Sequence, residues 1–80
     1  MNVAVFNAKR FEKPFLDAAA RDAGISLTYF EPRLDSTTAP LATGHEAVLI
    51  FVNDVADRVS LEKLAAVGVR LLATRSAGFN

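Results

Sequence analysis

Short apolar runs alternate with amphipathic stretches along the chain, and the same order occurs twice. One apolar run occupies residues 3–6, and a second, wholly apolar run occupies residues 47–51. Each is followed by a stretch with helical spacing and then by another run of strand type, at residues 25–30 and 69–74. The pattern predicts strand, helix and strand twice over, which makes two βαβ units.

The first helix is expected from about Phe11 to Ala23, with Gly24 as the left-handed residue that ends it. Pro14 fits its first turn, where a missing N–H costs nothing. Apolar positions three and four residues apart predict the buried face of this helix. The members of that face are Phe11, Phe15, Ala18, Ala19 and Ala23.

The second helix is expected to begin after Ser60, a favourable N-cap residue, and to end at Gly68. Its predicted inward positions are Leu61, Leu64 and Ala65, with Val67 as a further candidate. The connection between the two units, residues 31–44, contains proline, serine and threonine and is expected to hold one turn of helix.

Two βαβ units predict an α/β fold, here a flavodoxin-like, doubly wound parallel sheet with strand order 2-1-3-4. Four strands and two main helices make it incomplete, because a full sheet of this kind has a fifth strand and another covering helix. The sequence therefore indicates part of a domain.

Composition narrows the function classes. The 80 residues carry nine basic and nine acidic side chains, which argues against nucleic-acid binding. Without cysteine and with one histidine, disulfides are excluded and a metal site is not expected. No apolar run approaches the roughly 20 residues of a membrane span, and the first residues lack a signal-peptide pattern, so a cytoplasmic location is expected.

Open parallel sheets bind ligands outside the carboxyl ends of their strands, where the strand order reverses. That rule selects residues 7–9 after the first strand, residues 51–54 after the third and residues 75–79 after the fourth. Gly78 permits close backbone approach, and free N–H groups there are suited to a carboxylate. A plain turn is the alternative interpretation of this glycine.

Other polar residues indicate structural roles. His45 precedes the third strand at the opposite edge, which favours a capping or solvated histidine. Asn53 and Asp54 are of a type common in turns and caps, and Arg33 and Asp35 resemble loop charges. The four glycines lie far apart, so neither a dinucleotide fingerprint nor a P-loop is present. No catalytic, cofactor-binding or metal-binding residue is predicted within the chain.

Four stretches together resemble the amino-terminal segment of the NAD-dependent D-lactate dehydrogenases, in the D-isomer-specific 2-hydroxyacid dehydrogenase family. They are residues 3–11, 45–54, 61–69 and 75–80, the last being an Arg-x-x-Gly-hydrophobic-Asn segment. The resemblance implies that residues 1–80 form the amino-terminal part of a substrate domain, whose Rossmann coenzyme domain lies outside this chain. It also implies NAD as cofactor, pyruvate or D-lactate as substrate, and a homo-oligomer.

By the same resemblance, the backbone N–H groups of Ala77 and Gly78 face the substrate carboxylate, and Phe51 lines the pocket near the substrate side chain. Arg75, Ser76 and Asn53 are expected nearby. The family's carboxylate-binding arginine, its acid/base histidine and its glutamate have no counterpart here, so the chain alone is expected to be inactive. The alternatives are a free-standing flavodoxin-like binding module and part of a related 2-hydroxyacid dehydrogenase.

Overall fold

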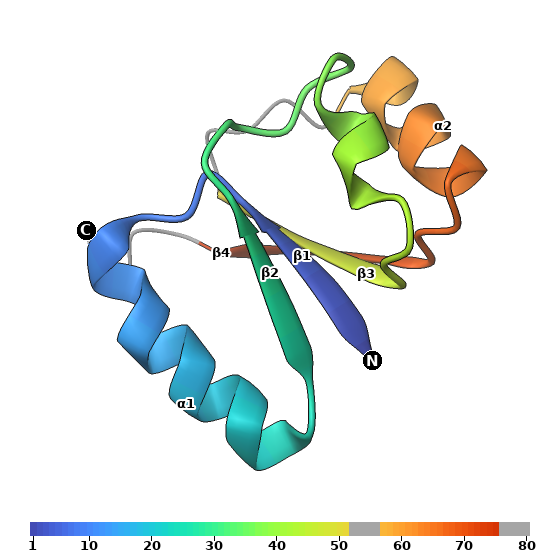
Figure 1. The fold of residues 1–80 in the computed structure, drawn as a ribbon. Coiled ribbons are helices and arrows are strands. Elements are labelled where there is room, and N and C mark those ends of the chain that lie inside the picture. The colour runs from blue at the N-terminus through green and yellow to red at the C-terminus, as the bar shows by residue number, and fades with distance from the viewer. Residues whose placement is uncertain (52–56, 76–80) are drawn as a thin grey trace.

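The computed structural model describes residues 1–51 and 57–75, which form one four-stranded sheet with helices on both faces (Figure 1). The strands are β1 (Asn2–Phe6), β2 (Ser26–Phe30), β3 (Ala47–Phe51) and β4 (Leu71–Arg75). The helices are α1 (Lys13–Ala23) and α2 (Arg58–Ala66), with two short 3-10 turns, η1 (Arg10–Glu12) and η2 (Ala39–Ala42). Each predicted element is present, and the helical turn expected between the two units is η2.

All strand pairs are parallel, and the order β2-β1-β3-β4 is the predicted one. The first strand is central: Val3 lies opposite Leu27 of β2 and opposite Ala47 of β3. The α/β class and the doubly wound parallel arrangement are therefore confirmed. The strand order reverses between β1 and β3, which is the point where such sheets bind ligands.

Alternate residues of β1 supply two different cores, because successive side chains in a strand point to opposite faces. Ala4 and Phe6 belong to the cluster under η2 and α2, whereas Val3 and Val5 belong to the cluster on the α1 face. Figure 1 shows the two helices on opposite sides of the sheet.

The η2 and α2 face is closed. The Phe6 ring stacks on that of Phe30 with centroids 5.2 Å apart, and Phe6, Leu34, Ala39 and Ala42 have no exposed surface. Leu34, which belongs to the loop between β2 and η2, thus fills this core together with the 3-10 turn that follows it.

The α1 face is only partly covered. A groove of about 340 Å³ lies between α1 and the sheet. Apolar side chains line it from both sides, among them Leu16, Ala19, Leu49, Leu71 and Ala73. Because α1 packs over β1 and β2, the same face of β3 and β4 remains open among the described residues.

The predicted buried face of α1 is correct only in part: Ala19 and Ala23 line the groove between the helix and the sheet, but the two phenylalanines do not face the sheet. Phe11 is 67% exposed and Phe15 is 77% exposed, and Ala20 is the helix residue that is buried, beside the half-buried Leu16. Alanines occur on several sides of this helix, so apolar residues spaced three and four apart can be found on more than one of its faces. The small Ala20 side chain lets the helix lie close to the sheet. Pro14 lies in the first turn, and Gly24 ends the helix with φ 71°, both as predicted.

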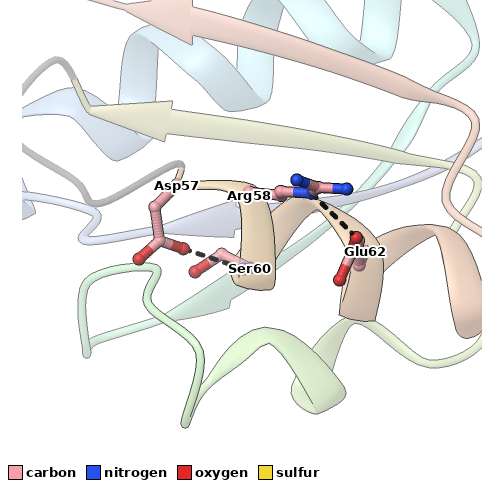
Figure 2. A network of polar contacts seen from close by, with 4 residues as sticks. All are labelled: Asp57, Arg58, Ser60 and Glu62. Atoms are coloured by element: carbon pink, nitrogen blue, oxygen red, sulfur yellow. Dashed lines mark hydrogen bonds and ion pairs between the residues drawn. The ribbon is translucent and has the colours of Figure 1, made fainter.

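The start of α2 also differs from the prediction. Its N-cap is Asp57, whose Oδ1 accepts a hydrogen bond of 2.9 Å from the Ser60 N–H (Figure 2). Ser60 is fully buried within the first turn, and its hydroxyl has no partner among the described residues. The hydrogen bond from the Ser60 backbone lowers the pKa of Asp57, because it stabilises the charged carboxylate.

Only one of the predicted inward positions of α2 is fully buried. Leu64 is 3% exposed and Val67 packs against the core, but Leu61 is 42% exposed and Ala65 is also exposed. Arg58 and Glu62 form an exposed ion pair on the outer side, with Nε and Oε2 3.2 Å apart (Figure 2). Such exposed pairs contribute little to stability.

Candidate functional site

The candidate site lies at the carboxyl ends of β1 and β3, where the strand order reverses. Within the described residues it comprises the turn after β1 and Phe51, the last residue of β3. Ala8 packs against the α1-side core in this turn. Residues 52–54 and 76–79, which the sequence also assigns to this edge, lie outside the described part of the chain.

The turn after β1 begins with a left-handed residue. Asn7 has φ 56°, a conformation that asparagine tolerates better than most residues. Its N–H donates to the Pro32 carbonyl over 2.9 Å, which ties the end of β1 to the segment after β2. The backbone therefore leaves the sheet in a defined direction at this edge.

Lys9 is fixed next in the turn by two reciprocal hydrogen bonds. Its N–H donates to Oε1 of Glu12 over 2.9 Å, and the Glu12 N–H donates to the Lys9 carbonyl over 3.0 Å. These bonds close the first turn of η1 and satisfy backbone groups that a helix start leaves free. These two bonds fix the position of the Lys9 backbone.

The Lys9 side chain extends to the neighbouring strand. Its Nζ lies 3.1 Å from Oδ1 of Asn7 and 5.9 Å from the centroid of the half-buried Phe51 ring. The distance of 5.9 Å to the ring centroid is near the outer limit for a cation–π contact. The sequence placed Lys9 and Phe51 at the same edge, and the structure brings their side chains together.

Phe51 lies opposite Arg75 in the pairing of β3 with β4. The described part of β4 thus ends at the level of the candidate site. Ala77 and Gly78, the predicted carboxylate-binding residues, lie outside the described residues, as do Asn53 and Ser76. Their assignment to the site stays a prediction.

Two further polar residues have structural roles, as predicted. The Nδ1 atom of His45 lies 3.2 Å from the Ala42 carbonyl, so the ring caps the end of η2. Asp35 accepts hydrogen bonds from the N–H groups of Thr37 and Thr38. The bond from Thr38 is the main cause of the lowered pKa of Asp35. Both side chains stabilise the loop that carries Leu34 into the core.

The residues present do not fit a dinucleotide. No glycine occurs before Gly24, so the turn after β1 cannot form the glycine-rich phosphate-binding loop of such sites. Across residues 1–51 and 57–75, no group of three or more potential metal ligands comes together. In the same residues, no helix is long and apolar enough to cross a bilayer.

Comparison with known proteins gives a consistent result over the whole chain. No family model matches. The chain is 42% identical over 80 residues to D-lactate dehydrogenase of Escherichia coli strain K12, and it covers 24% of that protein. It is 45% identical over 83 residues to 2-hydroxyacid dehydrogenase A of Aspergillus oryzae, again covering 24%.

The fold agrees with the sequence. The structure of Salmonella D-lactate dehydrogenase matches all of this chain with a TM-score of 0.92 at 42% identity, and the chain covers 24% of it. The chain thus spans about a quarter of the length of the relatives it matches. These matches define a class of proteins, the 2-hydroxyacid dehydrogenases, which are oxidoreductases. The chain matches the amino-terminal part of these proteins.

Within that class, D-lactate dehydrogenases are matched in both sequence and structure. The resemblance inferred from the four sequence stretches is thereby confirmed.

Proposed function

We propose that this chain is the amino-terminal part of the substrate domain of an oxidoreductase that interconverts pyruvate and D-lactate with NAD. The observation that carries the proposal is the match of all 80 residues, in sequence and in fold, to D-lactate dehydrogenases. The D-lactate dehydrogenase family is NAD-dependent in general. Since the residues present do not fit NAD, the cofactor would be held by a domain outside residues 1–80.

The proposed role of this segment is to bind and orient the substrate. Phe51 would line the pocket beside the substrate side chain, where its half-buried ring borders the strand ends. The backbone N–H groups of Ala77 and Gly78 would hold the carboxylate. NAD, when bound, supplies or accepts the hydride. Proton transfer would need an acid/base residue from outside this segment, since His45, the one histidine in the sequence, lies at the end of η2, before β3.

The open groove on the α1 face supports the assignment to part of a domain. Its apolar lining, which includes Leu49 and Leu71, is the kind of surface that α/β domains cover with a further element. We therefore propose that, in the protein that contains residues 1–80, additional chain packs on this face. A homo-oligomer and a cytoplasmic location are also part of the proposal.

The first test is the intact mass of the polypeptide from its native source, followed by NADH oxidation with pyruvate. A mass several times 8.6 kDa together with turnover of pyruvate to D-lactate is the expected result. A mass near 8.6 kDa without turnover would contradict the proposal and favour a free-standing flavodoxin-like binding module.

A second test concerns Phe51. In the intact enzyme, Phe51→Ala should loosen substrate choice, because the ring restricts the space for the substrate side chain. We expect the ratio of kcat/KM for pyruvate to that for a bulky 2-oxoacid to fall by about tenfold, the usual scale for contacts in an apolar pocket. Equal ratios in wild type and variant would count against this role.

A related 2-hydroxyacid dehydrogenase is the alternative. It is favoured by the 45% identity to the Aspergillus oryzae protein, whose name specifies no single acid. A panel of 2-oxoacids of increasing side-chain size distinguishes the two. Preference for pyruvate supports the first proposal, and preference for a larger oxoacid supports the alternative.

A further inference from the structure

We infer that Lys9 is a positioning residue that attracts the substrate anion to the strand ends and holds the Phe51 ring in place. The inference rests on the proposed function and adds a residue to it. Three observations carry it: the fixed backbone of Lys9, the surroundings of its ammonium group, and its place in the sheet.

The backbone of Lys9 is held on both sides. Its N–H and its carbonyl both bond to Glu12, and the preceding turn is anchored through Asn7 to the Pro32 carbonyl. A lysine on a free loop samples many positions, but this one begins from a fixed point one turn beyond β1. Less conformational entropy is therefore lost when its side chain points to the site.

The Lys9 ammonium has no acidic partner among the described residues. Its contacts are the neutral amide oxygen of Asn7 and the Phe51 ring, and it forms no ion pair with a carboxylate in residues 1–51 or 57–75. An ammonium has three N–H donors, and Asn7 accepts one. Lys9 is an exposed residue, and its ammonium has N–H donors that the described residues do not occupy.

The place of this charge is the third observation. It lies over Phe51 of β3, beside the point where strand order reverses and small ligands bind in open sheets. A 2-oxoacid is an anion, and a fixed cation at the rim raises its local concentration and favours one orientation of its carboxylate. Contact with the ring also restricts the movement of Phe51, which the proposed function places beside the substrate.

Lys13 provides a matched control. Its Nζ lies 5.2 Å from the ring of Tyr29, so it is also a lysine over an aromatic ring. Tyr29, however, belongs to β2, one of the two edge strands of the described sheet, and its hydroxyl donates to Asp17. A substitution of Lys13 removes the same charge from the same chain without touching the point of reversal.

The experiment is steady-state kinetics of the intact enzyme with pyruvate at several ionic strengths, for wild type, Lys9→Gln, Lys9→Arg and Lys13→Gln. For Lys9→Gln we expect KM to rise about fivefold with kcat within about twofold, the scale of one partly screened charge at an exposed rim. The rise of KM with added salt should also become shallower. Lys9→Arg should restore both, and Lys13→Gln should resemble wild type.

The outcomes separate the two proposals. An active wild-type enzyme in which Lys9→Gln and Lys13→Gln behave alike, with the same salt dependence, overturns the role of Lys9 and leaves the proposed function intact. A loss of kcat without a change in KM or salt dependence indicates a merely structural role and also overturns it. A wild-type protein that reduces no 2-oxoacid overturns the proposed function and this inference together.

Discussion

The two faces of the sheet use side chains from the same strands but reach different degrees of closure. On the η2 and α2 side, Phe6 and Leu34 have no exposed surface. On the α1 side, Leu71 is 56% exposed and borders a groove. The difference lies in the covering layer: among the described residues, two helical elements cover one face, whereas α1 covers only part of the other. An apolar strand pattern thus indicates that both faces of the sheet can be buried. The helices that pack on each face determine how much of that face is buried.

The largest expected effect is on the free energy of unfolding, and it compares a phenylalanine in the closed core with one on the outside of α1. In the intact protein, Phe6→Ala should lower the free energy of unfolding by about 3–5 kcal/mol, because it leaves a cavity beside Phe30. Phe15→Ala, at a 77% exposed position, should change it by less than about 0.5 kcal/mol. Urea unfolding measures both. If Phe6→Ala prevents folding, Phe6→Leu provides the milder comparison, and equal losses at both sites would contradict the assignment of faces.

The next prediction tests whether the open face is covered in the complete protein. Ala73→Asp places a carboxylate in the apolar groove, and it should destabilise the intact protein by about 1–3 kcal/mol if further chain packs there. Ala18→Asp, on an exposed side of α1 that does not line the groove, should cost no more than about 0.7 kcal/mol of helix propensity. Equal small effects would mean that the groove faces water in the whole protein.

A smaller effect is expected at the start of the helix that closes the covered face. The folded state lowers the pKa of Asp57, so its charged form stabilises the fold above the ordinary pKa of 3.8, and this contribution is lost as the pH falls below that value. Asp57→Ala should lower Tm by several degrees at pH 7, and Asp57→Asn by less, because asparagine also caps helices. Thermal unfolding from pH 7 to pH 3 is the measurement. A gap between wild type and Asp57→Ala that stays constant below pH 4 would show that the charge is not responsible.

The smallest effect concerns the buried hydroxyl of Ser60. Because Oγ has no partner in the described part of the chain, Ser60→Ala removes an unsatisfied polar atom and should be neutral or stabilising by up to about 1 kcal/mol. A loss of more than that in chemical denaturation would reveal a hydrogen bond to this hydroxyl in the intact protein.

The strands and their order could be predicted from the sequence because buried parallel strands are short, apolar and bounded by turn residues. Residues 47–51 illustrate this, since an unbroken apolar run has few other interpretations. The buried face of α1 could be predicted only in part. Its alanines fit several apolar stripes, and packing against β1 and β2 selects the stripe that contains Leu16 and Ala20. The N-cap of α2 was predicted three residues too late, at Ser60 instead of Asp57. Aspartate and serine are about equally favourable at an N-cap, so the sequence does not show which of the two begins the helix.

The candidate site shows the same limit. Its edge of the sheet follows from topology, so Lys9 and Phe51 were correctly expected at neighbouring strand ends. Their contact depends on the left-handed turn at Asn7 and on the bonds to Glu12, which fix where the lysine side chain begins. Neither feature leaves a recognisable periodic signal. The roles of Ala77 and Gly78 stay predictions, because these residues lie outside the described part.

The central position of β1 has a practical consequence for anyone who handles this protein. β1 pairs with β2 on one side and with β3 on the other, so the described sheet has no continuous hydrogen-bonded order without it. The Met1 carbonyl already accepts a hydrogen bond from the Ser26 N–H, and the Met1 side chain borders the groove. A deletion or insertion at Met1 would disturb this hydrogen bond and the pairing of β1 with β2 that follows it.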